Sequence, residues 1–245
     1  MQLPKPDNVS FETCPAGTHV AVCYRFVDLG TQRYQHPGGP RDQHKVMLSW
    51  ELPEALIQEG DYAGKPFTFH QQYTWSMNEK ATLRRHLESW RGIPFREEDF
   101  GEDGCDTRDL LGKPCMLTLA QSSQSFRAFV SLQGISRLVK GKQPPGAPHN
   151  PITYFSMDGT HIDMVTFDRL SEKVKATIQK SPEYERLTRA VPMRIWKARA
   201  VTHAETLYSR HSQSPQPAPD DLRSRGSPSI IMPVARRQAT CQEVV

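Results

Sequence analysis

One amphipathic helix pattern, set among strand patterns, limits the folds that this sequence can adopt. A short aromatic strand pattern runs directly into a segment in which Leu83, Leu87 and Trp90 recur at the spacing of one helical face. Asn78 predicts the start of this helix, because its side chain can accept a hydrogen bond from a backbone N–H of the first turn. Residues 92–94 (GIP) predict its end. A single helix inserted between strands is therefore expected.

Strand patterns lie on both sides of this helix. In residues 17–31 the side chains alternate with a period of two and are rich in β-branched and aromatic types, which predicts a long strand. The full set of expected strands is residues 17–31, 44–52, 67–75, 113–121, 125–139 and 154–157. Gly134 predicts a bulge or bend. Residues 54–58 predict a helical turn, and residues 168–187 a helix that breaks or restarts at Pro182.

This order of elements predicts a mainly β (α+β) fold. Five or six strands with one inserted amphipathic helix and a C-terminal helix describe a small antiparallel β-barrel or a curled antiparallel sheet. The oligonucleotide/oligosaccharide-binding (OB) barrel, which often carries a helix between its third and fourth strands, fits this order. We expect an irregular lead-in over residues 1–16, an OB-like barrel domain over residues 17–190, and a basic tail over residues 191–245. The tail is rich in Ser, Pro, Gln and Arg, which predicts disorder.

The positive charge of the chain is concentrated in this tail. Residues 1–190 carry 23 basic and 23 acidic side chains, whereas residues 191–245 carry 8 basic and 4 acidic ones. The net charge of +4 therefore gives no reason to expect a folded part that binds polyanions over its whole surface. Any nucleic-acid site in the folded part has to come from local patterning.

Cysteines and acidic residues give little support for catalysis or for a metal. The five cysteines form no CxxC pair and follow no secretory leader, so reduced thiols in the cytoplasm are expected. Cys14 or Cys105 with a histidine would make a zinc site, but the spacing matches no structural zinc pattern. Asp28 and Glu51 are alternative metal ligands, although strand-end carboxylates are commonly turn caps. The expectation is a non-catalytic protein without a cofactor or metal.

Several segments resemble a known family. They are DLGTQ (28–32), KVMLSWELPE (45–54), YTWSMNEKATLRRHLESWRG (73–92), DLLGKPCML (109–117) and SPEY (181–184). The chain resembles phage-encoded early-region proteins that are regarded as single-stranded DNA-binding proteins, over roughly residues 17–187. The resemblance implies single-stranded DNA binding in phage DNA replication or recombination, in the host cytoplasm. It also makes replication proteins candidate partners of the C-terminal tail.

Basic and aromatic side chains on the predicted strands and helix are the candidate contacts with DNA. Exposed aromatic rings stack on bases and basic groups hold phosphates, which makes such binding dependent on salt. The candidates are Arg25, Tyr34, Lys45, Trp50, Phe69, Tyr73, Trp75, Arg84, Arg85, Arg91, Arg127 and Arg137.

Two alternatives remain open for these residues and for the function. The aromatic faces also suit core packing, and Arg84 is spaced to pair with Glu88 on a solvated helix face. The alternative function is a protein-interaction module of the phage replication or anti-host apparatus. Charge neutrality of residues 1–190 favours that module, whereas arginines on strands beside aromatic residues favour DNA.

Overall fold

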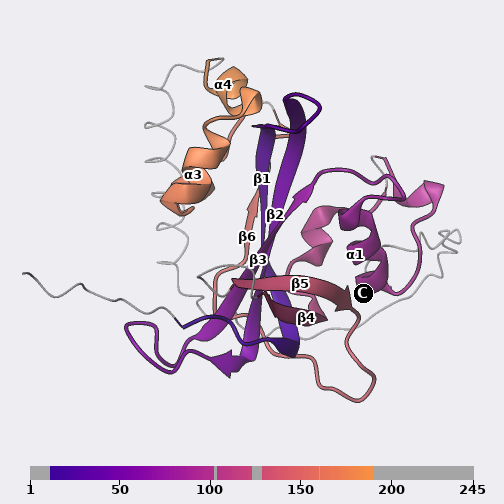
Figure 1. Cartoon of the computed structure of the whole chain (residues 1–245), viewed down its shortest axis with the longest axis vertical. Helices are drawn as coiled ribbons and strands as arrows, with labels where there is room; N and C mark the ends of the chain where they lie inside the picture. Colours follow the sequence, from indigo (N-terminus) through magenta and orange to yellow (C-terminus); the bar gives the residue numbers. More distant parts are fainter. Residues whose placement is uncertain (1–11, 102–103, 123–128, 160, 190–245) are drawn as a thin grey trace, which may run out of the picture.

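The computed structural model describes residues 12–101, 104–122, 129–159 and 161–189 (Figure 1). The predicted tail from residue 191 onward and Arg127 lie outside these residues. The strands are β1 (Gly17–Tyr34), β2 (Arg41–Leu56), β3 (Pro66–Thr74), β4 (Pro114–Ser122), β5 (Phe129–Ser136) and β6 (Thr153–Phe155). The α-helices are α1 (Thr82–Arg91), α2 (Met164–Asp168), α3 (Glu172–Ile178) and α4 (Pro182–Arg189), and two short 3₁₀ helices are η1 (Glu97–Asp99) and η2 (Thr107–Leu110).

The six strands form one mainly antiparallel sheet in the order β3-β2-β1-β4-β5, and β6 pairs with β1 in parallel. This confirms the predicted mainly β fold with a helix inserted between the third and fourth strands. In the described part of the chain, β3 and β5 are the two ends of the sheet and do not pair with each other. The sheet is therefore open there, so the predicted OB-like barrel is not confirmed, while an antiparallel sheet is.

Bulges break the regular alternation that the sequence predicted for β1. The register with β2 shifts between Cys23 and Arg25, so that Tyr24 is an extra residue, and it shifts again between Asp28 and Gly30. A bulge bends a strand and redirects the side chains that follow it. A third shift lies opposite Thr118 and Leu119, where β5 carries the predicted irregularity next to Gly134.

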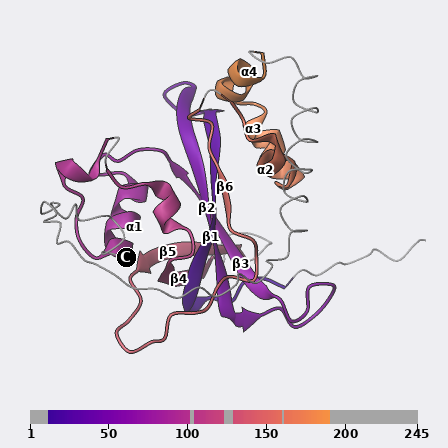
Figure 2. The same ribbon diagram turned by 180° about the vertical axis from the view of Figure 1, so that it is seen from behind.

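Helices cover the two sides of the long β1–β2 ribbon. In Figures 1 and 2, α1 lies on one side of the ribbon, while α3 and α4 lie on the other side, near its tip. Two hydrophobic clusters correspond to these two sides. Trp50, Leu87 and Trp90 belong to the cluster that includes α1, and Leu29 and Ile178 belong to the one with α3 and α4. Burial on both sides explains why β1 is apolar along most of its length.

Helix α1 begins later than predicted. Asn78 accepts a hydrogen bond from the backbone N–H of Lys80 on its side chain and one from Ala81 on its carbonyl, so it forms a turn before the helix. Ala81 is the N-cap residue and offers no side-chain cap. The end is as predicted, because Gly92 adopts φ 80° and donates its N–H to the Glu88 carbonyl.

Two other helix predictions need correction. The helix expected over residues 168–187 is divided into α3 and α4, and the short α2 precedes it; α4 begins at Pro182, as the predicted restart required. The helical turn expected at residues 54–58 is wrong, because β2 continues to Leu56. No helix in the described ranges combines the length and apolar character needed to cross a bilayer.

Candidate nucleic-acid interface

Three of the aromatic candidates are core residues. Trp50, Phe69 and Tyr73 are 1%, 8% and 4% exposed. They lie on the face of β2 and β3 that packs against α1, and the Tyr73 hydroxyl forms a hydrogen bond with His86 Nδ1 at 2.9 Å. None of them has a free ring face on which a base could stack, which corrects their selection as a stacking platform. Trp75, at the end of the same row, is 42% exposed.

The arginines of α1 are largely occupied by protein partners. Arg84 Nε donates to Glu88 at 2.9 Å, and its Nη1 donates to the Met77 carbonyl. Arg91 is buried and holds both oxygens of Asp99 at 2.7 and 2.8 Å. These hydrogen bonds lower the pKa of Asp99 to about 2. Arg91 is thus a structural residue, and its selection as a phosphate contact is corrected.

The remaining arginine candidates do not form one site with these. Arg85 is exposed and contacts Thr82 at 3.4 Å, and Arg137 is exposed and donates to the Arg91 carbonyl at 2.6 Å. The side chain of Arg137 also packs on Gly92, where an added Cβ would lie 2.8 Å from its Nε. Arg127 cannot be placed, because it lies outside the described residues.

The clearest basic position on the sheet is Arg25. It lies opposite Ser49 on β2, which in turn lies opposite His70 on β3, so these three residues form a row across three strands. Arg25 Nε donates to Ser49 Oγ at 3.2 Å, and Nη2 lies 3.4 Å from His70 Nδ1. Its guanidinium also lies over the ring of Tyr24, 5.4 Å from the centroid. The bulge at Tyr24 thus brings an aromatic ring and an arginine together.

Lys45 occupies the same face, because it lies four residues before Ser49 in a regular part of β2. Its Nζ donates to Thr74 Oγ1 at 2.8 Å and lies 4.9 Å from the centroid of the Tyr34 ring. Tyr34 is 41% exposed at the end of β1. We define the polar sheet face as the residues Arg25, Lys45, Ser49, Thr68, His70, Gln72 and Thr74.

The cations of this polar sheet face have neutral partners. Among the described residues, no carboxylate forms an ion pair with Arg25 or Lys45. Partial desolvation lowers the pKa of Lys45. Desolvation and then the nearby charge of Arg25 lower the pKa of His70 to about 4, so the imidazole is neutral at pH 7. The one carboxylate on this face of β2, that of Glu51 opposite Thr68, is buried and accepts hydrogen bonds from His149 and Asn150 instead. Neither Arg25 nor Lys45 is therefore held in an ion pair, which leaves both cations able to bind an anion.

An open groove continues from Lys45 around the edge of the sheet. It has a volume of about 480 Å³ and lies between β3, the edge strand, and the start of α1. Lys45 and Lys80 line it together with hydrogen-bonding side chains that include Gln72, Thr74 and Asn78. An extended ligand bound at Lys45 could therefore continue along this polar groove, past the edge of the sheet.

The buried carboxylates serve the fold. Glu51 accepts hydrogen bonds from the backbone N–H groups of His149 and Asn150, both at 2.8 Å. It therefore holds the loop that precedes β6. Across the described ranges, no group of three or more His, Cys, Asp or Glu side chains is arranged to hold a metal ion. Cys23 and Cys115 are fully buried in the core, and burial raises the pKa of both thiols.

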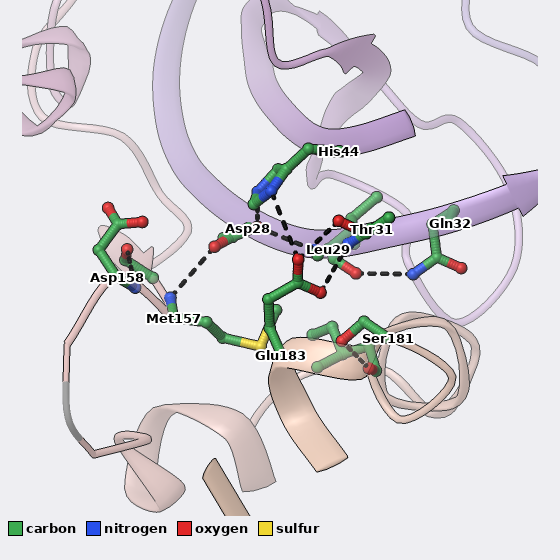
Figure 3. Close-up of polar contacts among 12 residues, drawn as sticks. Asp28, Leu29, Thr31, Gln32, His44, Met157, Asp158, Ser181 and Glu183 are labelled. Carbon is green, nitrogen blue, oxygen red and sulfur yellow. Dashed lines mark hydrogen bonds and ion pairs between the residues drawn. The ribbon is translucent and has the colours of Figure 1, made fainter. Parts of the chain in front are cut away.

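Asp28 belongs to a polar network that joins α4 to the sheet (Figure 3). Its carboxylate lies 2.7 Å from His44 Nε2 and accepts the Gly30 N–H, while Glu183 accepts hydrogen bonds from the N–H and hydroxyl of Thr31. His44 Nδ1 lies 3.8 Å from Glu183, so both imidazole nitrogens face carboxylates. Desolvation of Glu183 is outweighed by these hydrogen bonds, which lower its pKa. The network therefore holds α4 against the sheet.

Sequence reasoning missed the polar residues of β3. Thr68, His70, Gln72 and Thr74 alternate with the aromatic positions of the same strand, so the period of two was sufficient to find them. The sequence prediction selected the aromatic face of β3 instead, and that is the face that packs on α1.

Comparison with known proteins assigns neither a family nor a function to the chain. No protein-family model matches the chain, and no curated protein matches it significantly.

Proposed function

We propose that the chain binds single-stranded DNA, without catalysis, on the polar sheet face. The observation that carries this proposal is the pair of partly buried cations, Arg25 and Lys45, on one side of the sheet without a carboxylate partner among the described residues. An anionic backbone would supply the missing charges, and the affinity would decrease as salt increases. Tyr34 and Tyr24 beside these cations add aromatic surface, and Tyr34 is exposed enough to stack on a base.

The arrangement of strands supports the same proposal. OB folds bind oligonucleotides on the face of their second and third strands and with the loops beside it. We infer that the sheet is an open OB-like barrel, since β1 pairs with both β2 and β4 and α1 follows β3. The polar sheet face then lies where an OB fold holds its ligand. From the resemblance in sequence we further infer a role in phage DNA replication or recombination in the host cytoplasm.

Fluorescence anisotropy of a labelled oligo-dT with the full-length chain tests this proposal. We expect Arg25→Met to weaken binding by about 1 kcal/mol, because a charge-assisted phosphate contact is lost. Arg96→Met is the matched control: it also removes one arginine, but an exposed one that pairs with Glu98. All variants keep the basic tail, so its non-specific contribution is the same in each. Equal affinities for the two variants, or no binding by the wild type, would overturn the proposal.

The protein-interaction module remains a second candidate function. It is favoured by an apolar cavity of about 250 Å³ beside α1, which is not part of the polar sheet face. If the chain acts only by binding a protein partner in this cavity, Arg25→Met should not change the affinity for oligo-dT. The same titration therefore separates the two functions.

A further inference from the structure

The cavity beside α1 is lined mainly by apolar side chains. It lies between the end of β3, α1, η1 and η2, and Trp75, Leu87, Phe95, Phe100 and Leu110 line it. Trp75 and Phe100 are 42% and 39% exposed, so two large rings stand at its opening. Since a cavity of roughly 150 Å³ can hold benzene, its volume of about 250 Å³ admits at least one large apolar side chain.

The polar groups around the cavity are acidic. Asp99, Asp106 and Asp109 line it, whereas Arg91 is the only cation among the lining residues and is held by Asp99. In the sequence, residues 97–109 contain seven acidic residues and one basic residue, and the described part of this stretch forms one wall of the cavity. A phosphate backbone would be repelled here. The chemistry fits an apolar side chain from a basic peptide.

The chain itself contains such a peptide. Residues 230–237 read IIMPVARR, an apolar run followed directly by two arginines, within a tail that carries all of the excess positive charge. Forty residues separate this segment from Arg189, the last described residue. A linker of that length has a root-mean-square span of roughly 35 Å, comparable to the diameter of a domain of this size. The segment can therefore reach any face of the folded part.

A second apolar and basic stretch, residues 193–197 (MRIWK), is a weaker candidate. It begins four residues after Arg189, the end of α4. Helix α4 lies on the opposite side of the β1–β2 ribbon from α1, which lines the cavity, in both views (Figures 1 and 2). So short a connection cannot pass around the sheet.

We propose that the cavity beside α1 binds residues 230–237 of the chain's own tail. Ile231 or Met232 fills the apolar space, and Arg236 and Arg237 meet the acidic rim. Because the segment is tethered, its effective concentration at the cavity is high, so even a weak contact is populated. This contact brings the basic tail to the acidic rim of the cavity, and it does not rest on DNA binding.

Cys105, which lines the cavity, provides a native probe. In full-length protein with Cys241→Ser, Val234→Cys places one thiol inside the segment, and Ser212→Cys places one in the tail outside it. After brief oxidation with diamide, peptide mass spectrometry measures the disulfide with Cys105. We expect Val234→Cys to form that disulfide about tenfold more than Ser212→Cys, because docking raises its effective concentration. Phe100→Ala, at the opening of the cavity, should reduce the yield several-fold.

Equal yields from the two tail positions, or a yield unaffected by Phe100→Ala, would overturn the proposal. A Cys105 link found only between two chains would also overturn it, because the segment would then come from a second copy. Phe100→Ala thus tests the cavity, and the two tail cysteines test which segment fills it. Both results are independent of the oligo-dT titration.

Discussion

Two regions of the molecule carry arginines, and they use them in opposite ways. On α1, Arg84 and Arg91 are held by Glu88 and Asp99. On the polar sheet face, Arg25 and Lys45 lie against neutral oxygens, an imidazole and aromatic rings. Both regions place cations near aromatic residues, but Arg84 and Arg91 are paired with carboxylates, whereas Arg25 and Lys45 are not.

The difference shows that the partner of a cation matters more than its position in an aromatic, basic segment. A guanidinium that already holds a carboxylate would have to give up that pair before it could bind a phosphate. A cation with neutral partners binds an anion without that loss. We therefore expect the α1 region to govern stability and the polar sheet face to govern binding.

The largest effect should follow loss of the Asp99 carboxylate. Asp99→Ala leaves Arg91 buried without its main partner, so we expect the free energy of unfolding to fall by about 3 kcal/mol, as measured by urea denaturation. The matched control is Glu98→Ala, which breaks an exposed pair with Arg96 and should cost less than about 0.5 kcal/mol. Similar losses in the two variants would contradict a structural role for Arg91.

A smaller effect on binding should follow loss of Tyr34. Tyr34→Ala removes an exposed ring beside Lys45, and we expect oligo-dT affinity to fall by about 1–2 kcal/mol, the size of one stacked base. Tyr62 provides the control, since it is also exposed and has Lys65 over its ring at 5.1 Å, but lies outside the polar sheet face. If Tyr62→Ala weakened binding equally, stacking would not be specific to this face.

The smallest effect concerns His70 and pH. The folded protein binds a proton at His70 only near pH 4, whereas the unfolded chain does so at the ordinary histidine pKa of about 6.5. Lowering the pH through this window therefore favours the unfolded state. The loss of unfolding free energy between pH 7 and pH 5 should be slightly smaller in His70→Gln than in the wild type. An identical pH dependence would show that His70 is not desolvated beside Arg25.

Most of the fold followed from local patterns, and the site did so only in part. Period-two segments located the strands, and the spacing of Leu83, Leu87 and Trp90 gave the buried face of α1. The bulge at Tyr24 and the pairing of Arg91 with Asp99, eight residues later, produce no periodic pattern in the sequence from which they could be predicted. Which face of β3 packs on α1 depends on tertiary contacts. The aromatic residues of that face were therefore selected for binding although the sheet buries them.

The most direct test of this comparison is the salt dependence of oligo-dT binding in two double variants of the full-length chain. Arg25→Met/Lys45→Met should reduce the slope of log K against log salt by about 1.4, since each single-strand phosphate contact contributes about 0.7. Arg84→Met/Arg96→Met removes the same charge from positions paired with Glu88 and Glu98 and should leave the slope unchanged, once circular dichroism confirms folding. Equal slopes in both variants would contradict the assignment of DNA binding to the polar sheet face.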